Sequence, residues 1–143
     1  MLVRIVEEIA EAYFQLKGYM VLRNYPIPAS GKRRIWTDID VLAFNNEKLF
    51  IVQCKRGSLN QERREKLVEW FHNAEKHIRE IEPFRSFVEK LGLEVIRLYV
   101  AWYVTRRDEE WLSEKGIRVV RAENMVREMG RDYSREDWRT HTT

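Results

Sequence analysis

The chain has 143 residues, of which 44% are hydrophobic and 34% are charged, and its formal net charge at pH 7 is +3. This length fits one domain, and the composition excludes a disordered or low-complexity chain. No run approaches the roughly 18 apolar residues of a membrane span, and the acidic, amphipathic N-terminus is unlike a signal peptide, so we expect no membrane partner. The single cysteine, Cys54, cannot form an internal disulfide, which favours a reducing, cytoplasmic setting.

The first part of the chain predicts a helix, a strand and a basic loop. Apolar residues recur at helical spacing over residues 2–17, and Gly18 fits the end of a helix. Residues 19–24 predict a short strand, which we expect the prolines at positions 26 and 28 to end. The residues that follow, 29–34, predict a flexible basic loop.

Residues 37–55 predict two strands joined by a turn at Asn45–Asn46, because asparagine tolerates left-handed backbone angles. Side chains alternate between the two faces of a strand. The first strand should therefore present Asp38 and Asp40 on one face and Ile39, Val41 and Ala43 on the other. The second should present Gln53 and Lys55 on one face and Phe50, Val52 and Cys54 on the other.

The remaining residues predict alternating helices and strands. The expected elements are a helix over 60–81 with Ser58 in a capping box, a helix from Pro83 to Gly92, an apolar central strand over 95–105, a short helix capped by Asp108, a parallel strand over 117–120 and a helix over 122–129. The predicted fold is α/β, a mixed central β-sheet flanked by helices in the order αβββαβ followed by αβα. We expect one domain over residues 1–130 and a polar tail over residues 131–143.

Polar side chains converge where the two apolar strands end. Asp38, Asp40, Gln53 and Lys55 bring two carboxylates, an amide and an ammonium to one place, and burying such groups without partners is costly. A hard cation would resolve the conflict, because Mg²⁺ prefers oxygen ligands and commonly binds one or two carboxylates together with a substrate phosphate. Lys55 would then lie where phosphate charge builds up in a transition state.

At these residues the chain resembles the PD-(D/E)xK nuclease superfamily, which includes archaeal Holliday-junction resolvases and many restriction enzymes. Asp40-Val-Leu-Ala matches the first half-motif, and Gln53-Cys54-Lys55 matches the second, with glutamine in place of the usual acid as in the Mrr-like branch. Ile39 stands where some members have the proline that gives the motif its name. The resemblance covers residues 3–121 and implies the restriction-endonuclease-like core.

The resemblance implies a Mg²⁺- or Mn²⁺-dependent deoxyribonuclease that cleaves phosphodiester bonds and leaves a 5′-phosphate. Asp40 would be the main metal ligand, together with the Gln53 side-chain oxygen and the Cys54 backbone carbonyl. Glu7 of the first helix would hold a second metal or a metal-bound water, with Glu8 or Asp38 as alternatives for this second acid. Lys55 would orient or help to deprotonate the attacking water and stabilise the phosphorane charge.

Basic residues near the strand ends suggest the partner. Lys32, Arg33, Arg34 and Arg56 could track a DNA backbone. The substrate stays open between a four-way junction, whose symmetric cleavage would require a homodimer, and a restriction or repair target. The main alternative is an inactive protein that keeps the nuclease fold for DNA binding or as a scaffold, because Gln53 leaves the site one negative charge short. Another class of phosphate enzyme is disfavoured, because the chain has no P-loop, zinc cluster or G-x-S-x-G turn.

Overall fold

The computed structural model describes the backbone of residues 2–28, 36–55, 57 and 59–141, and within these ranges the side chains of residues 4–131. Its elements are α1 (Leu2–Leu16), β1 (Met20–Pro28), β2 (Trp36–Phe44), β3 (Lys48–Lys55), α2 (Gln61–Glu80), α3 (Phe84–Leu91), β4 (Glu94–Ala101), α4 (Arg106–Glu114), β5 (Ile117–Arg121) and α5 (Ala122–His141). This order confirms the predicted succession of helices and strands.

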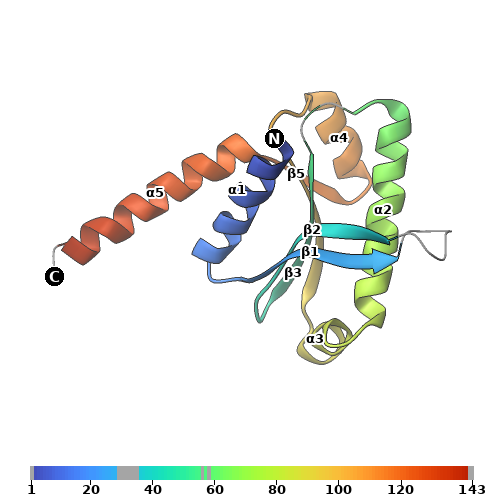
Figure 1. Ribbon diagram of the computed structural model, residues 1–143, viewed down its shortest axis with the longest axis horizontal. Coiled ribbons are helices and arrows are strands. Elements are labelled where there is room, and N and C mark those ends of the chain that lie inside the picture. Colours follow the sequence, from blue (N-terminus) through green and yellow to red (C-terminus); the bar gives the residue numbers. More distant parts are fainter. Residues whose placement is uncertain (1, 29–35, 56, 58, 142–143) are drawn as a thin grey trace.

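The five strands form one mixed sheet in the order β1-β2-β3-β4-β5. The β1–β2 and β2–β3 pairs are antiparallel, whereas the β3–β4 and β4–β5 pairs are parallel. The predicted α/β class with a mixed, helix-flanked sheet is therefore confirmed (Figure 1). The expectation that the strand over 95–105 is central was wrong, since β3 holds that position and β4 ends at Ala101.

Helices cover both faces of the sheet. On one face α1 and α5 pack together, and their buried residues Val6, Ala10 and Phe14 from α1 and Ala122 and Met125 from α5 meet those of the strands (Figure 1). The Tyr13 hydroxyl and the Lys17 ammonium of the α1 end both donate to the Glu128 carboxylate of α5, at 3.1 and 2.7 Å. Since α1 carries Glu7, α5 helps to fix the position of that acid.

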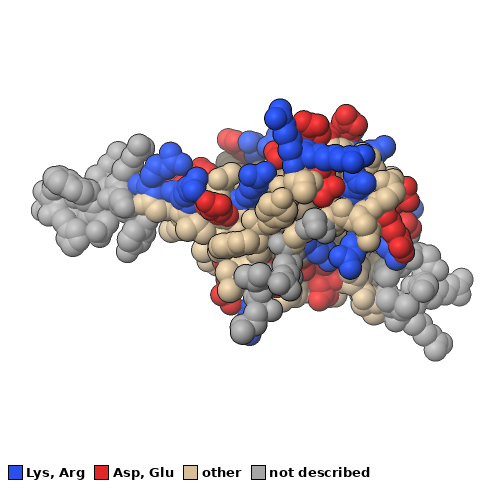
Figure 2. Space-filling model, turned by 90° about the horizontal axis from the view of Figure 1, so that it is seen from above, with Lys and Arg blue, Asp and Glu red and all other residues tan. Residues whose placement is uncertain are grey.

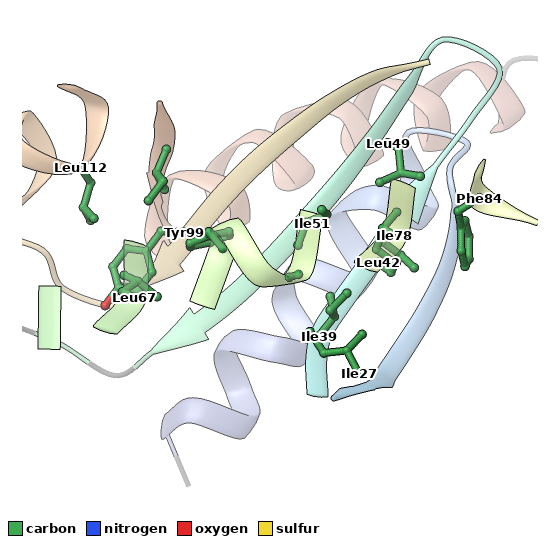
Figure 3. Close-up of a cluster of buried hydrophobic side chains, with 14 of the residues drawn as sticks. Ile27, Ile39, Leu42, Leu49, Ile51, Leu67, Ile78, Phe84, Tyr99 and Leu112 are labelled. Atoms are coloured by element: carbon green, nitrogen blue, oxygen red, sulfur yellow. The ribbon is translucent and has the colours of Figure 1, made fainter. Parts of the chain in front are cut away.

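The second face carries the larger core, which is covered by α2, α3 and α4. Figure 3 shows this cluster, in which Ile78 of α2 lies beside Leu42 of β2 and Leu67 of α2 lies beside Tyr99 of β4. Tyr99 of β4 is fully buried in the same cluster. Both faces of β3 and β4 are therefore buried, which explains why their sequences are nearly continuous apolar runs.

Several predicted boundaries were wrong for identifiable reasons. The strand predicted over 19–24 continues to Pro28, because β1 is an edge strand and edge positions tolerate proline. Asn60, and not Ser58, caps α2 by accepting a hydrogen bond from the Arg63 backbone N–H at 2.8 Å, and Ser58 lies outside the described residues. The cap of α4 is Thr105, which accepts from the backbone N–H of Asp108.

The last helix is longer than its sequence indicates. We expected it to end at Met129, but α5 continues to His141 (Figure 1). The division of the chain into residues 1–130 and a tail stays a prediction. Within the described part of the chain, no helix combines the length and the apolar character needed to cross a membrane.

Candidate functional site

The side-chain alternation of β1 and β2 breaks at the level of Asn24 and Asp40. On β1, Arg23 reaches the acids of α1, whereas Tyr25, only two residues on, packs against Phe84 on the opposite face. Asn24, between them, has a left-handed backbone with φ of 53°, which asparagine tolerates better than most residues. The strand thus changes the face it presents at Asn24.

The same break occurs on the neighbouring strand. Pairs Arg23–Val41 and Tyr25–Ile39 flank the level of Asn24 and Asp40 in the β1–β2 register. Ile39 belongs to the α2-side core, whereas Val41 belongs to the α1-side core. Our expectation that Ile39, Val41 and Ala43 share one face was therefore wrong for Ile39, and Asp40 lies at the irregularity.

Asp40 also lies where β2 and β3 separate. Their pairing ends at Val41 and Val52, so that continuing the register by one residue would place Asp40 opposite Gln53. The Cys54 backbone N–H instead donates to Oδ2 of Asp40 at 2.8 Å. A side-chain carboxylate thus replaces the missing strand-to-strand bond, and this contact fixes the acid between the two strand ends.

Glu7 of α1 comes to the same place. Its carboxyl group lies close enough to that of Asp40 to raise the pKa of Asp40, and its side chain is only 15% exposed. Because two adjacent carboxylates repel each other, this contact requires a shared proton or a cation. The predicted pairing of an acid from the first helix with Asp40 is present in the structure.

Burial and neighbouring charge both act on Asp40. Burial, with a smaller contribution from the charge of Glu7, raises the pKa of Asp40 to about 6, although the Cys54 N–H and the charge of Lys55 oppose the rise. Burial likewise raises the pKa of the Cys54 thiol, to which the negative charges of Asp40 and Glu7 also contribute. Cys54 is therefore a buried apolar residue and not a nucleophile, as expected from the sequence.

Lys55 and Gln53 belong to the same end of β3 but differ in exposure. Lys55, at the end of β3, is exposed, and its charge acts on Asp40. Gln53 is 6% exposed, and its Oε1 atom has no hydrogen-bond partner among the described residues. Alternation along β3 places Gln53 on the face of Ile51, and its register neighbour on β4 is Tyr99. We call Glu7, Asp40, Gln53 and Lys55 the strand-end site.

The other predicted residues are separated from this group or cannot be placed. Asp38 is exposed, and the Glu8 side chain is 58% exposed with its carboxylate 3.5 Å from Arg4. Of the two acids, Glu7 is thus the one that reaches Asp40. The predicted DNA-binding residues Lys32, Arg33, Arg34 and Arg56 lie outside the described residues.

Sequence reasoning missed Arg23. Its Nη1 atom donates to Oε1 of Glu11 at 3.1 Å, and its Nη2 atom lies 3.9 Å from Oε2 of Glu7. Arginine in an amphipathic edge strand usually faces solvent, and the only sequence signal was the asparagine that follows it. A cation of the protein therefore already neutralises part of the charge of the acids.

The oxygen atoms of the strand-end site suit a hard divalent cation. Among the described residues, no group of three or more His, Cys, Asp or Glu side chains could hold a metal ion. The donors that meet here are the two carboxylates of Glu7 and Asp40. The unpaired Oε1 of Gln53 belongs to the same end of β3, but strand alternation directs it to the α2-side face and not toward Glu7, so the expected convergence of Gln53 with Asp40 on one face was wrong. Such an oxygen-only set with few charges fits Mg²⁺, which keeps several waters and shares a substrate phosphate.

A separate groove of the described surface lies elsewhere. It has a volume of about 930 Å³ and runs between α4, β5 and the start of α5, with Glu109, Glu110 and Glu114 among its lining residues. The groove is lined by acidic and basic side chains together, with Arg106 and Arg121 beside the three glutamates, and none of the strand-end residues lines it. We therefore assign the candidate site to the acids and not to the groove.

Comparison with known proteins bears on both the fold and the family. The sequence profile of a family described as the nuclease-related domain (NERD) matches residues 4–105. The fold is similar to the crystal structure of AF1548, a protein of unknown function, with a TM-score of 0.58 and 14% identity. It is also similar to the crystal structure of protein VC1899 from Vibrio cholerae, with a TM-score of 0.51 and 15% identity.

Both structural neighbours are longer proteins. The match covers 85% of this chain in each comparison, but 58% of the first neighbour and 29% of the second. At these identities the likeness shows the fold alone. No curated protein matches the chain.

Proposed function

Because the chain belongs to the family of nuclease-related domains, we propose that it is a metal-dependent nuclease whose strand-end site hydrolyses phosphodiester bonds of DNA. The resemblance to the PD-(D/E)xK superfamily is confirmed by this family membership. The metal, the substrate and the roles of the residues belong to the proposal.

One observation carries the proposal. Asp40 accepts a hydrogen bond from the Cys54 N–H at 2.8 Å, and burial together with the nearby carboxyl of Glu7 raises its pKa to about 6. Two partly buried carboxylates that lie side by side destabilise the fold unless a proton or a cation neutralises them. A divalent cation would bind both carboxylates and could also bind a substrate phosphate. Lys55 lies at the end of β3 next to them.

Mg²⁺ or Mn²⁺ would be held by Asp40, Glu7, the Gln53 Oε1 and the Cys54 carbonyl oxygen. When bound, such an ion neutralises phosphate charge and lowers the pKa of a bound water. Lys55 donates hydrogen bonds to the phosphate oxygens and stabilises the negative charge that develops as water attacks phosphorus and the P–O bond breaks. By resemblance to the superfamily, the product carries a 5′-phosphate.

Family membership implies contact with nucleic acid, and we propose DNA as the partner. The basic residues Lys32, Arg33, Arg34 and Arg56 would bind its backbone. A four-way junction is one candidate substrate, and its symmetric cleavage would require a homodimer with two sites. A restriction or repair target is the other.

The test is cleavage of labelled DNA by the full chain. Single strand, duplex, flap and four-way junction are each incubated with Mg²⁺, Mn²⁺ or EDTA. We expect metal-dependent cleavage that is lost in Asp40→Asn and in Lys55→Met and is retained in Asp38→Asn, which changes an exposed acid of the same strand. Cleavage that persists in the Asp40 and Lys55 variants would refute the assignment.

A second function is worth testing because of Arg23. Its guanidinium lies 3.9 Å from Glu7 and hydrogen-bonds Glu11. The arginine therefore partly neutralises these acids, as a metal ion would in an active nuclease. This favours a nuclease fold kept for nucleic-acid binding. Binding without cleavage in either metal, unchanged in Asp40→Asn, would identify that function.

A further inference from the structure

Two exposed aromatic residues follow β4. Trp102 is 44% exposed and Tyr103 is 58% exposed, whereas Ala101 before them and Val104 after them are almost completely buried. We call Trp102 and Tyr103 the aromatic pair. Because buried residues anchor both ends of this short segment, the exposure of the rings does not arise from a frayed chain end. Among the described residues, neither ring stacks on another aromatic side chain.

The aromatic pair begins one residue beyond the level of Lys55. In the parallel register of β3 and β4, Lys55 pairs with Ala101. Neighbouring strands lie about 4.8 Å apart. The chain therefore places two exposed aromatic residues next to the strand end that carries Lys55, to which we assign the scissile phosphate.

The segments that follow β3 and β4 are tied together. The Leu59 backbone N–H donates to the buried Asp108 carboxylate at 3.3 Å, and the Tyr99 hydroxyl donates to the Gly57 carbonyl at 3.4 Å. Arg121 of β5 donates to the Val104 carbonyl at 3.0 Å. These contacts connect the backbone on both sides of the aromatic pair to the backbone that follows Lys55, so that their relative position is fixed by the fold.

Charge alone does not explain how nucleic acid would bind here. On the face shown in Figure 2, acidic side chains lie among the basic ones. A duplex presents mainly its charged backbone, and its bases stay stacked on one another. Unpaired bases, in contrast, can stack on exposed aromatic rings, and this interaction tolerates any base because each has a π-face.

We propose that the aromatic pair stacks unpaired bases beside Lys55, so that the substrate is single-stranded or locally unpaired nucleic acid. This inference rests on the proposed nuclease function, since that function places the scissile phosphate at Lys55. It assigns Trp102 and Tyr103 to substrate selection.

The experiment measures binding of the full chain without cleavage. Fluorescence anisotropy of a labelled 12-nucleotide oligothymidine and of a labelled hairpin duplex is recorded in EDTA. We compare the wild type with the double variant Trp102→Leu/Tyr103→Leu, which keeps apolar side chains but removes the rings, and with Trp102→Phe/Tyr103→Phe, which keeps stacking. Met20→Ala is the control, because Met20 is 66% exposed at the start of β1, where it pairs with the end of β2.

We expect the single strand to bind more tightly than the duplex. Each ring removed in the leucine variant should weaken single-strand binding about tenfold, whereas the phenylalanine variant and Met20→Ala should bind within about twofold of the wild type. Equal binding of duplex and single strand, or undiminished binding by the leucine variant, would overturn the inference.

Failure of the inference and failure of the proposed function give different results. If the wild type cuts DNA with Mg²⁺ but the leucine variant binds and cuts single strands normally, the nuclease stands and the role of the aromatic pair is wrong. If no metal supports cleavage but the leucine variant alone loses single-strand binding, the aromatic pair is confirmed and the nuclease function is not.

Discussion

The Nη2 atom of Arg23 lies 3.9 Å from Oε2 of Glu7, so a fixed cation of β1 faces one of the two acids that meet at the strand ends. Arg23 also hydrogen-bonds Glu11, one helical turn further along α1, at 3.1 Å. In the absence of a metal this arginine reduces the repulsion between Glu7 and Asp40. It is therefore both a stabilising residue of the fold and a competitor of any divalent cation.

Removing this competitor should strengthen metal binding. We expect Arg23→Gln to bind Mg²⁺ several-fold more tightly than the wild type, because a nearby positive charge opposes the entry of another. Isothermal titration or metal-dependent melting measures the effect. Arg97→Gln is the matched control, since Arg97 forms a similar partly buried ion pair with Glu75 on the opposite face. Weaker metal binding in Arg23→Gln would mean that Arg23 holds Glu7 in place instead.

Replacement of Asp40 by asparagine should stabilise the metal-free protein while abolishing cleavage. Burial raises the pKa of Asp40 to about 6 from an ordinary value of 3.8, so ionisation above pH 6 destabilises the folded state. The amide of the introduced asparagine would keep an oxygen for the Cys54 N–H without the charge. Urea unfolding in EDTA at pH 7.5 should show a gain of up to about 3 kcal/mol.

The pH dependence gives this prediction its control. Because the folded pKa is raised, the wild type regains stability as the pH falls through 6, and below about pH 4 Asp40 is protonated in both folded and unfolded states. The advantage of Asp40→Asn should therefore shrink between pH 6 and pH 4. A constant advantage over this range would show that the charge of Asp40 is not its origin.

Divalent metal should raise the melting temperature, and Glu7 should be required for the rise. Ligands that bind only the folded state stabilise it. At pH 8 we expect Mg²⁺ or Mn²⁺ to raise Tm by several degrees, and at pH 5 by much less, because protons compete for Asp40. Glu7→Gln should reduce the rise at pH 8. Glu8→Gln should leave it unchanged, since Glu8 is exposed and pairs with Arg4.

Gln53→Glu should make the fold depend on metal. Gln53 is 6% exposed and its Oε1 atom has no hydrogen-bond partner among the described residues, so a buried carboxylate there costs a few kcal/mol without a cation. We expect a lower melting temperature in EDTA and a larger rise on addition of Mg²⁺ than the wild type shows. If Mg²⁺ does not restore stability, Gln53 is not a metal ligand.

The sequence predicted the order of the helices and strands and the position of the site along the strands, because both depend on local sequence signals. Apolar periodicity located the strands, and Gly92, with its left-handed φ of 70°, ended α3 as expected. The half-motifs brought Asp40 and Lys55 together, and in the structure the charges of Glu7 and Lys55 both act on Asp40.

The errors have a physical cause in tertiary structure. Strict alternation put Ile39 on the face of Val41, but the irregularity at Asn24 and Asp40 moves Ile39 to the opposite core. Such a break depends on pairing between two strands and cannot be recognised from one of them. The partnership of Arg23 with Glu7 depends on the same break, which explains why sequence reasoning missed both.

The protein's only thiol lies beside the site it could report on. Cys54 donates its backbone N–H to Asp40, its side chain is 1% exposed, and burial raises the pKa of its thiol, so a maleimide or disulfide reagent can react only when the strand end opens. The labelling rate of the unmodified chain therefore measures how often this end of β3 opens. Metal ions, oligonucleotides and each variant above can be compared by that rate, without an introduced probe.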